Sequence, residues 1–492
     1  MRWEGDTSEI IILGGGLGGL VAGTRLSKKS HSVLLLKESE YQRCYEENGF
    51  RFVPFSSLSE KRVSRTFLRK ISQMLNLSLQ SGSPEEERRA KVDSDIDNQE
   101  VGFQIILPEA RVDLYSQRPL LQREWRREFP KETSQIGEFY AEMDHLRQVL
   151  METEVKESHG SFFPLRPWSL FRRWRSFGLL QEGGIEEKFF NLSKEFRQFL
   201  QLQLLTWGNL LPDRFPATLA AYVLCMNGGL SEPTSSFDIV ELEERILAEF
   251  KQAGGKVDEV DRVERIDKKW RREFTITPAE DQRVFKSKLL ILNSPLHGLS
   301  KLMNDGDNPL LKWQKRIQPC YLLLPFFLGI REKVIPVGMK DLLISILDLE
   351  KPLEKGNLLL LSFSPKGDES RAPEGKRALI VESLVPFEDL DQTSLSDQQE
   401  GVMQHLRHLF PFLDKYIDFI DLNWAAEQIP RWSYPHLSYR TTSDLCWREG
   451  IVPSRMSKDL YFVGKEAFPY LGLEGEVLSG LMAAEQILQK FG

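Results

Sequence analysis

The chain is 492 residues long, which is enough for two or more domains with a large buried core. Its net charge of −7 at pH 7 argues against a basic surface for nucleic acid, so no nucleic-acid partner is expected. The four cysteines lie far apart and form no C-x-x-C pair, so neither a zinc site nor a disulfide framework is predicted. No run reaches the ~18 to 20 apolar residues that span a bilayer, and no apolar signal segment precedes the first strand. We therefore expect a cytoplasmic protein that does not cross a membrane.

Near the N-terminus an apolar segment leads directly into a glycine-rich turn. Ile10 to Leu13 predicts a strand, Leu20 to Lys29 a helix, and Val33 to Leu36 a second strand. The glycines between strand and helix match G-x-G-x-x-G, which permits a tight turn, close approach of a pyrophosphate and close packing of the helix. The pyrophosphate would bind the free N–H groups at the helix start. We predict a nucleotide-binding βαβ unit, rather than a glycine turn of another α/β fold, with these turn residues: Gly14, Gly16, Leu17, Gly18 and Gly19.

The middle of the chain alternates between helical and strand patterns. Residues 85–100 are charged and polar, which predicts a surface loop. Helices are predicted at Leu120 to Met151, with a break at Phe129-Pro130, at Phe189 to Leu211, and at Asp238 to Ala253, where Gly254-Gly255 ends the helix. Strands are predicted at Lys256 to Ile266, Glu273 to Thr277 and Leu289 to Asn293.

After Pro295 the chain becomes rich in strand patterns. Strands are predicted at Cys320 to Ile330, Leu342 to Leu347, Leu358 to Ser364 and Ala378 to Val385, followed by a helix at Leu395 to Leu409 and a further strand pair. This order predicts an α/β fold with α+β insertions, in which a nucleotide domain is interrupted twice. We assign residues 1–60, 220–300 and 450–492 to that domain, and residues 61–219 and 301–449 to a second, mixed β-sheet and helical domain.

The C-terminal segment, residues 459 to 488, predicts a short strand, a loop that ends at Gly475, and a helix. The helix contains small residues that permit close approach to a sheet or a ligand: Ser479, Gly480, Ala483 and Ala484. Its start near Glu476 and Val477 would offer backbone N–H donors to an acceptor.

This segment resembles the C-terminal signature of flavin amine oxidases and phytoene-desaturase-type enzymes. The middle of the chain supports the same resemblance. The family's "G-G-x-V…V-x-x-I" strand pair is similar to Gly254-Gly255 with Val257, followed by Val263 to Ile266. Phe129-Pro130 and Met226 to Leu230 look more like phytoene desaturases. The resemblance implies a Rossmann-like FAD-binding domain and a substrate domain. FAD would lie with its pyrophosphate at Gly14 to Gly19, its adenine at the backbone of Val263, and its flavin edge at Gly475 to Val477.

The chain departs from the family pattern at several positions. The residue expected to bind the adenosine ribose is Lys37, and Glu38 comes one position late. The "G-G-R" that wraps the flavin phosphates is absent. Lys465 replaces the acidic residue after Gly464, and Glu476 replaces a small residue near the flavin. Two explanations are open. In the first, the cofactor site is rebuilt and Lys37 or Lys465 binds a phosphate. In the second, the fold is kept for binding while flavin chemistry is lost.

Three functions therefore stay open. The leading hypothesis is an FAD-dependent oxidoreductase that moves hydride to or from an apolar, isoprenoid-type substrate. The alternatives are an amine- or porphyrinogen-oxidase-like flavoenzyme and a catalytically silent protein that binds lipid or a protein partner. No catalytic residue and no metal ligand set can be named from the sequence.

Other segments allow two interpretations each. Ser161 to Leu180 interleaves aromatics with arginines, which suits either peripheral contact with a membrane or a packed helix pair. Trp432 and Tyr434 either line the flavin's substrate face or pack in a loop. His405 and His408 have a spacing that two metal ligands could use, but without a third ligand we expect surface histidines, and the same holds for His297.

Overall fold

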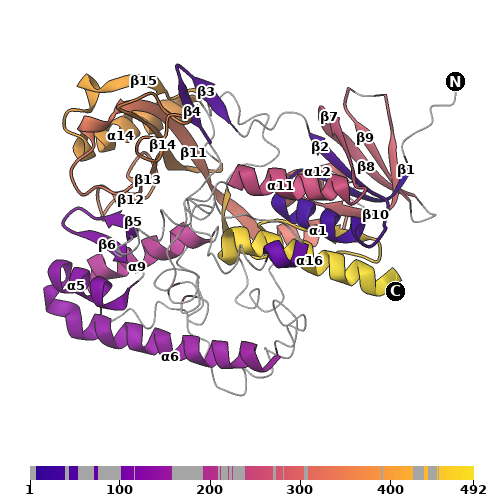
Figure 1. Cartoon of the computed structure of the whole chain (residues 1–492), viewed down its shortest axis with the longest axis horizontal. Helices are drawn as coiled ribbons and strands as arrows, with labels where there is room; N and C mark the ends of the chain where they lie inside the picture. Colours follow the sequence, from indigo (N-terminus) through magenta and orange to yellow (C-terminus); the bar gives the residue numbers. More distant parts are fainter. Residues whose placement is uncertain are drawn as a thin grey trace.

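Two β-sheets organise the protein, one at each end of the molecule in Figure 1. The predicted loop at 85–100, the arginine- and aromatic-rich segment 161–180, Met226 to Leu230, Trp432 and Tyr434 lie outside the described residues, so those interpretations stay predictions. This computed structural model describes residues 7–38, 44–53, 71–75, 101–115, 117–157, 192–208, 211, 220, 224, 239–269, 273–280, 282–303, 308–388, 392–424, 437–441, 452 and 454–491.

The first sheet has seven strands in the order β7-β2-β1-β10-β9-β8, with β17 also paired to β10. β7, β2, β1, β10 and β17 run parallel, whereas β9 and β8 pair antiparallel. The sheet therefore takes its strands from three separate parts of the chain. The bounds are β1 (Thr7–Leu13), β2 (Val33–Glu38), β7 (Lys256–Val260), β8 (Val263–Lys269), β9 (Glu273–Pro278), β10 (Phe285–Leu292) and β17 (Leu460–Phe462).

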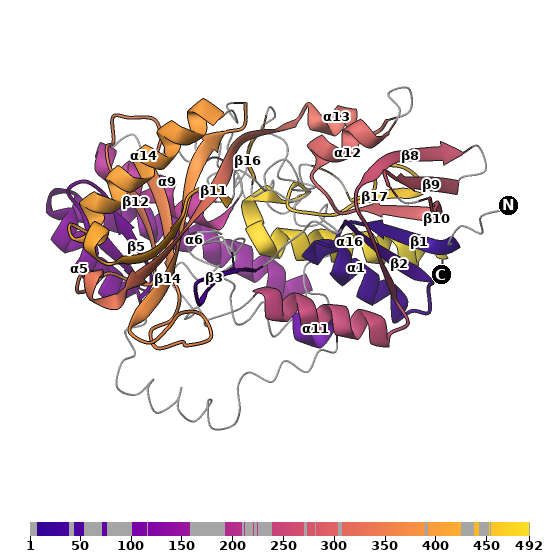
Figure 2. The same ribbon diagram turned by 90° about the horizontal axis from the view of Figure 1, so that it is seen from above.

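Three helices cover this sheet: α1 (Leu17–Ser27), α11 (Ile239–Gln252) and α16 (Gly472–Phe491). α1 contacts both of the others, and Figure 2 shows α1 and α16 side by side. The contact between α1 and α16 is close, because a Cβ added to Gly480 would lie 2.2 Å from the carbonyl oxygen of Gly18. The predicted small-residue face of the last helix therefore packs on α1.

The second sheet has eight strands in the order β15-β11-β14-β13-β12-β5-β6, with β16 also paired to β11. The four predicted strands between residues 320 and 385 and the helix that follows are confirmed. β13 is buried along its whole length, as its run of four leucines indicates. The bounds are β5 (Val101–Ile106), β6 (Arg111–Tyr115), β11 (Ile317–Arg331), β12 (Leu342–Ile346), β13 (Leu358–Phe363), β14 (Lys376–Pro386), β15 (Ile417–Asp421), β16 (Leu437–Thr441) and the helix α14 (Gln392–Leu409).

A small hairpin, β3 (Tyr45–Glu47) and β4 (Phe50–Phe52), packs against this second sheet. The ring of Phe52 lies 4.9 Å from that of Phe327 on β11, measured between centroids. The hairpin therefore carries the N-terminal part of the chain across to the second sheet.

Helices α5 (Arg118–Glu128), α6 (Thr133–Glu157) and α9 (Lys194–Trp207) lie on one side of the second sheet (Figure 1). The predicted break at Phe129-Pro130 is confirmed, since a short 3₁₀ turn separates α5 from α6. Ser193 caps α9, with its hydroxyl accepting the N–H of Phe196 at 3.1 Å. Two shorter helices, α12 (Leu296–Leu302) and α13 (Leu311–Gln314), lie on the path from the first sheet to the second.

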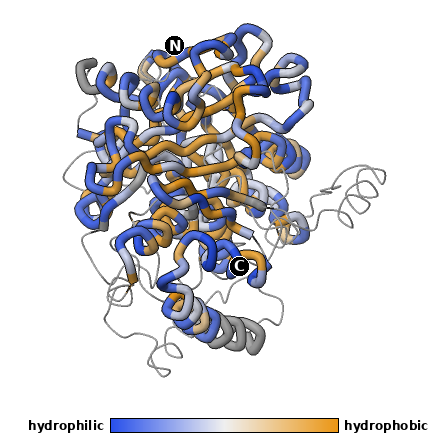
Figure 3. Tube along the Cα trace, turned by 90° about the vertical axis from the view of Figure 1, so that its left-hand side faces the viewer, coloured by the Kyte–Doolittle hydropathy of each residue, from blue (hydrophilic) through white to orange (hydrophobic). Residues whose placement is uncertain are grey.

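Apolar strands occupy the middle of the molecule, with more polar segments around them (Figure 3). Burial of these side chains supplies the main driving force for folding. Among the described residues, no helix has the length and apolar character needed to cross a bilayer.

Candidate functional site

The carboxyl ends of the parallel strands meet at one edge of the first sheet, which is where ligands bind in open α/β sheets. β1 ends at Leu13, β2 at Glu38, β10 at Leu292 and β17 at Phe462. The residues that follow these strands therefore lie close together, and they include most of the predicted site residues.

The glycine turn follows β1 as predicted. Gly14 has φ of +112°, a conformation that side chains rarely adopt, and its N–H donates to the carbonyl of Leu36 at 2.9 Å. Gly16 precedes the first residue of α1 in an extended conformation. α1 begins at Leu17, three residues before the predicted start, so Leu17, Gly18 and Gly19 form its first turn.

Two side chains from distant parts of the chain bind the N–H groups of this first turn. The Gly18 N–H donates to Oε1 of Glu476 at 3.2 Å, and the Gly19 N–H donates to Oδ1 of Asn293 at 2.9 Å. A Cβ on Gly16 would lie 2.7 Å from Glu476 Oε1 and 2.9 Å from Asn293 Oδ1. The helix start is therefore capped from outside, and the glycines are needed for this close approach.

Asn293 was predicted only as the end of a strand, and the structure gives it a larger role. It is buried, its N–H donates to the carbonyl of Leu13 at 2.8 Å, and its Nδ2 donates to the carbonyl of Val463 at 3.2 Å. It thus joins the ends of β1, β10 and β17 to the start of α1. A polar residue that ends an apolar parallel strand is the signal that could have identified it.

The last helix begins earlier than predicted. α16 starts at Gly472, which has φ of +53°, so the expected helix start at Gly475 to Val477 is wrong. Gly472 can adopt this conformation because it has no Cβ, and Pro469 to Leu471 form a 3₁₀ turn just before it. Gly475 packs against the backbone of Phe468, and Val477 is buried in the core. Glu476 therefore approaches α1 through its side chain, while its N–H lies beyond the first turn.

Gly464 lies in the loop that links β17 to α16. Its φ is +146°, and its N–H donates to Oγ of Ser479 at 2.9 Å. Ser479 in turn donates to the carbonyl of Glu476 at 2.6 Å. Lys465 follows in the same turn and is half-buried. These bonds fix the backbone of α16 against the loop.

The two charged residues at the end of β2 point to different neighbours. Glu38 accepts the N–H of Val263 at 3.0 Å, which joins β2 to the start of β8. The aliphatic stem of Lys37 lies against Gly15, 3.3 to 3.4 Å from the position of an added Cβ. Lys37 therefore brings a positive charge to the glycine turn, and Glu38 already binds the backbone group of Val263 that the resemblance assigns to adenine.

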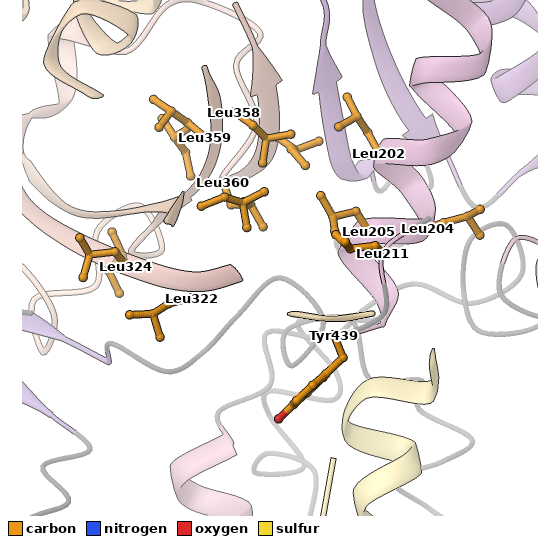
Figure 4. Close-up of a cluster of buried hydrophobic side chains, with 14 of the residues drawn as sticks. Leu202, Leu204, Leu205, Leu211, Leu322, Leu324, Leu358, Leu359, Leu360 and Tyr439 are labelled. Carbon is orange, nitrogen blue, oxygen red and sulfur yellow. The ribbon is translucent and has the colours of Figure 1, made fainter. Parts of the chain in front are cut away.

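A buried acid lies where the two sheets meet. Glu466 accepts the N–H of Leu296 at 2.7 Å and the hydroxyl of Tyr439 on β16. Burial raises the pKa of Glu466 to about 7 and raises the pKa of Tyr439 well above its usual value. In Figure 4 the hydroxyl of Tyr439 points away from a group of buried leucines. Neither residue stands out from its local sequence.

The expectation of surface histidines is wrong for His405. This side chain is fully buried and hydrogen-bonds Oγ of Ser345 and the carbonyl of Gly356, each at 2.8 Å. Burial lowers its pKa to about 4, while His408 is exposed as expected. His297 is half-buried and lies 3.2 Å from the amide of Gln314. Within the described part of the chain, no group of three His, Cys, Asp or Glu residues could hold a metal ion.

A parallel sheet with a glycine turn at its carboxyl edge, joined to a second sheet of mainly antiparallel strands, defines the class of two-domain dinucleotide-binding proteins. Residues 239–488 match the family model of flavin-containing amine oxidoreductases. Because the match covers half of the chain, this protein belongs to that family, and it is an FAD-dependent oxidoreductase of the phytoene desaturase and amine oxidase type.

Similar proteins agree with this assignment. The prolycopene isomerase of Daucus carota is 24% identical over 98% of this chain and 80% of its own length. A redesigned putrescine oxidase has the same fold, with a TM-score of 0.64 and 14% identity over 98% of this chain and 99% of that one. An oxidoreductase from Methanosarcina mazei has a TM-score of 0.59 and 16% identity over 98% of this chain and 100% of that one.

The residues at the carboxyl edge fit FAD in most respects. The glycine turn permits close approach of a diphosphate, and Lys37 supplies a positive charge beside it. The carboxylate of Glu476 is the exception, because it binds an N–H group at the helix start where a phosphate oxygen is favoured. When bound, the flavin supplies the hydride acceptor or donor of the reaction.

Proposed function

We propose that this enzyme uses FAD to act on an extended apolar substrate of the isoprenoid or polyene class. The observation that supports this most strongly is the similarity to prolycopene isomerases over nearly the whole chain. Those relatives act on prolycopene, a polyene hydrocarbon. An amine or a porphyrinogen substrate is the alternative within the same family.

The interior between α9 and the second sheet is filled by apolar side chains. Buried leucines from α9, β11 and β13 lie in one cluster with the ring of Tyr439 (Figure 4). Their burial removes apolar surface from water and so stabilises the fold. The cluster includes Leu202, Leu204, Leu205, Leu211, Leu322, Leu324, Leu358, Leu359 and Leu360.

For the cofactor we propose that the turn from Gly14 to Gly19, with Leu17 and Gly18, holds the diphosphate of FAD. The adenosine would lie towards Lys37, Glu38 and Val263, which are at the carboxyl end of β2 and the start of β8. The flavin would lie towards the loop at Gly464 and Lys465, whereas the side chain of Glu476 faces the diphosphate at the start of α1. Gly18 binds Glu476 and Gly464 binds Ser479 on the same helix, which supports a shared site for the diphosphate and the flavin.

The test is turnover by the FAD-reconstituted protein. The protein would be incubated with phytoene and with poly-cis-lycopene in detergent micelles, and the products separated by chromatography. We expect an isomerised product, or a desaturated one when a quinone is added to reoxidise the flavin, and either should form only when FAD is present. Hydrogen peroxide formation with amines or porphyrinogens, without change in either polyene, would overturn the substrate assignment.

A glycine variant tests the cofactor site. Gly16→Val should abolish FAD retention, because its side chain would fill the space at the start of α1 that the diphosphate needs. The control is Gly298→Val, at a position where an added Cβ meets nothing within 4 Å. Bound flavin in the Gly16 variant, seen in the visible absorption spectrum, would reject this site.

A further inference from the structure

The start of α1 is occupied by a carboxylate that belongs to the chain itself. Glu476 is 5% exposed, and its Oε1 accepts the N–H of Gly18 at 3.2 Å. The same oxygen lies 2.7 Å from the position of a Cβ on Gly16. The carboxylate therefore lies against Gly16 and Gly18, at the positive end of the α1 dipole.

A diphosphate would compete with this carboxylate. Both are anions, both are favoured by free N–H groups at a helix start, and one N–H cannot serve both fully. Two further acids near the start of α16 are buried, Glu466 at 3% exposure and Glu474 at 6%. A second anion brought to this edge would therefore also meet like charge wherever those groups are ionised.

Contacts on both sides hold the backbone of Glu476 close to the start of α1. Its carbonyl accepts the hydroxyl of Ser479, which also holds the loop at Gly464. One turn further along α16, Gly480 lies directly against the backbone of Gly18. Only rotation of the Glu476 side chain can release the Gly18 N–H, and rotation gives up a buried, charge-assisted hydrogen bond.

We propose that Glu476 is an internal competitor of the cofactor's diphosphate and determines how tightly this protein holds FAD. Glu476 lowers the affinity by the free energy needed to move its carboxylate from the helix start. This role concerns the diphosphate and not the isoalloxazine ring. It depends on the family's cofactor and is independent of the substrate.

Binding measurements on three ligands separate these roles. ADP carries the diphosphate without a flavin, riboflavin carries the flavin without a phosphate, and FAD carries both. Each would be titrated, by calorimetry for ADP and by flavin fluorescence for the other two, against the wild type, Glu476→Ala and Glu476→Gln. The matched control is Glu485→Gln, which removes the ion pair between Arg25 of α1 and Glu485 of α16, away from the turn.

In Glu476→Ala we expect ADP and FAD to bind roughly tenfold more tightly or better, since a buried hydrogen bond to a charged group no longer opposes them. Riboflavin binding should be unchanged. Glu476→Gln should tighten ADP binding less, because its amide oxygen can still accept the Gly18 N–H. Glu485→Gln should bind all three ligands as the wild type does.

Several results would overturn the proposal. The first is an ADP Kd in Glu476→Ala that lies within twofold of the wild type, and the second is no detectable ADP binding in any variant. The third is an equal gain in ADP affinity in Glu485→Gln. The fourth is a gain in affinity for riboflavin alone. If Glu476→Ala does not fold, the isosteric Glu476→Gln decides, and an unchanged ADP Kd there rejects the proposal. These titrations need no substrate, so their failure leaves the polyene assignment standing.

Discussion

The carboxylate of Glu466 accepts the backbone N–H of Leu296 at 2.7 Å, although 170 residues separate them. They meet because β10 and β17 run parallel and side by side, so that the segments leaving both strands emerge at the same edge. The hydroxyl of Tyr439 also donates to this carboxylate, which brings in a strand of the second sheet. The acid therefore joins both sheets in a buried position.

This position makes the stability of the protein depend on pH. Burial raises the pKa of Glu466 from 4.5 to about 7, so the folded state keeps a proton that the unfolded state releases. Its stabilising contribution is complete below pH 4.5 and is lost as pH rises through 7, by roughly 3 kcal/mol. Glu466→Gln should remove this loss, as urea unfolding between pH 4.5 and 8.5 would measure. The same pH slope in the variant and the wild type would contradict the prediction.

A second variant tests the cause of the shift. The Tyr439 hydroxyl lowers the pKa of Glu466 by donating to its charged form. Tyr439→Phe should therefore move the loss of stability to a higher pH. A transition at an unchanged or lower pH would show that this hydrogen bond does not act on Glu466.

His405 should have the opposite pH dependence. Burial lowers its pKa from 6.5 to about 4, so between these pH values the unfolded state binds a proton that the folded state does not. Its contribution is complete above pH 6.5 and is lost as pH falls through 4, by roughly 3 kcal/mol. In His405→Asn this acid-side loss should disappear, which unfolding measured between pH 4 and 7 would test.

The matched control is His408→Asn, because His408 lies on the same helix but is exposed. It should unfold with the acid dependence of the wild type. An equal effect of both substitutions would mean that the buried position of His405 is not the cause.

Two glycine-to-alanine changes should have opposite signs. Gly480→Ala should destabilise the protein by about 1 to 3 kcal/mol, because its Cβ would lie 2.2 Å from the backbone oxygen of Gly18. Gly137→Ala in α6 should stabilise by about 0.5 to 1 kcal/mol, because nothing lies within 4 Å of its Cβ and alanine favours helix. Thermal unfolding of both variants measures the difference, and a shift of the same sign in both would contradict the close packing of α1 on α16.

Much of the fold follows from local pattern. The strand, glycine turn and helix at the N-terminus are where the sequence predicts them, and so are the four apolar strands of the second sheet between residues 320 and 385. Boundaries are less well predicted. The strand pair within Lys256 to Ile266 is present as β7 and β8, but α16 begins at Gly472, earlier than expected, because a glycine with positive φ allows the turn there.

Side-chain partners in the site could not be predicted in this way. The sequence contains Asn293, Glu466 and Glu476, but nothing local to each residue indicates what it binds. Glu476 reaches Gly18 across 458 residues of chain, and Asn293 reaches Gly19 across 274. His405 and His408 have the spacing of two metal ligands, yet His405 is buried and hydrogen-bonds Ser345 of β12.

By itself the sequence determined that this protein has a dinucleotide-type βαβ unit, a second domain rich in strands and the signature of a flavoprotein family. It could do so because hydrophobic periodicity and glycine conformations act over a few residues. Only the tertiary structure decided that the start of α1 is capped by Glu476 and Asn293 and that Glu466 is buried between the two sheets. Those contacts depend on the order of the parallel strands and on how closely α16 packs against α1, which are properties of the whole chain.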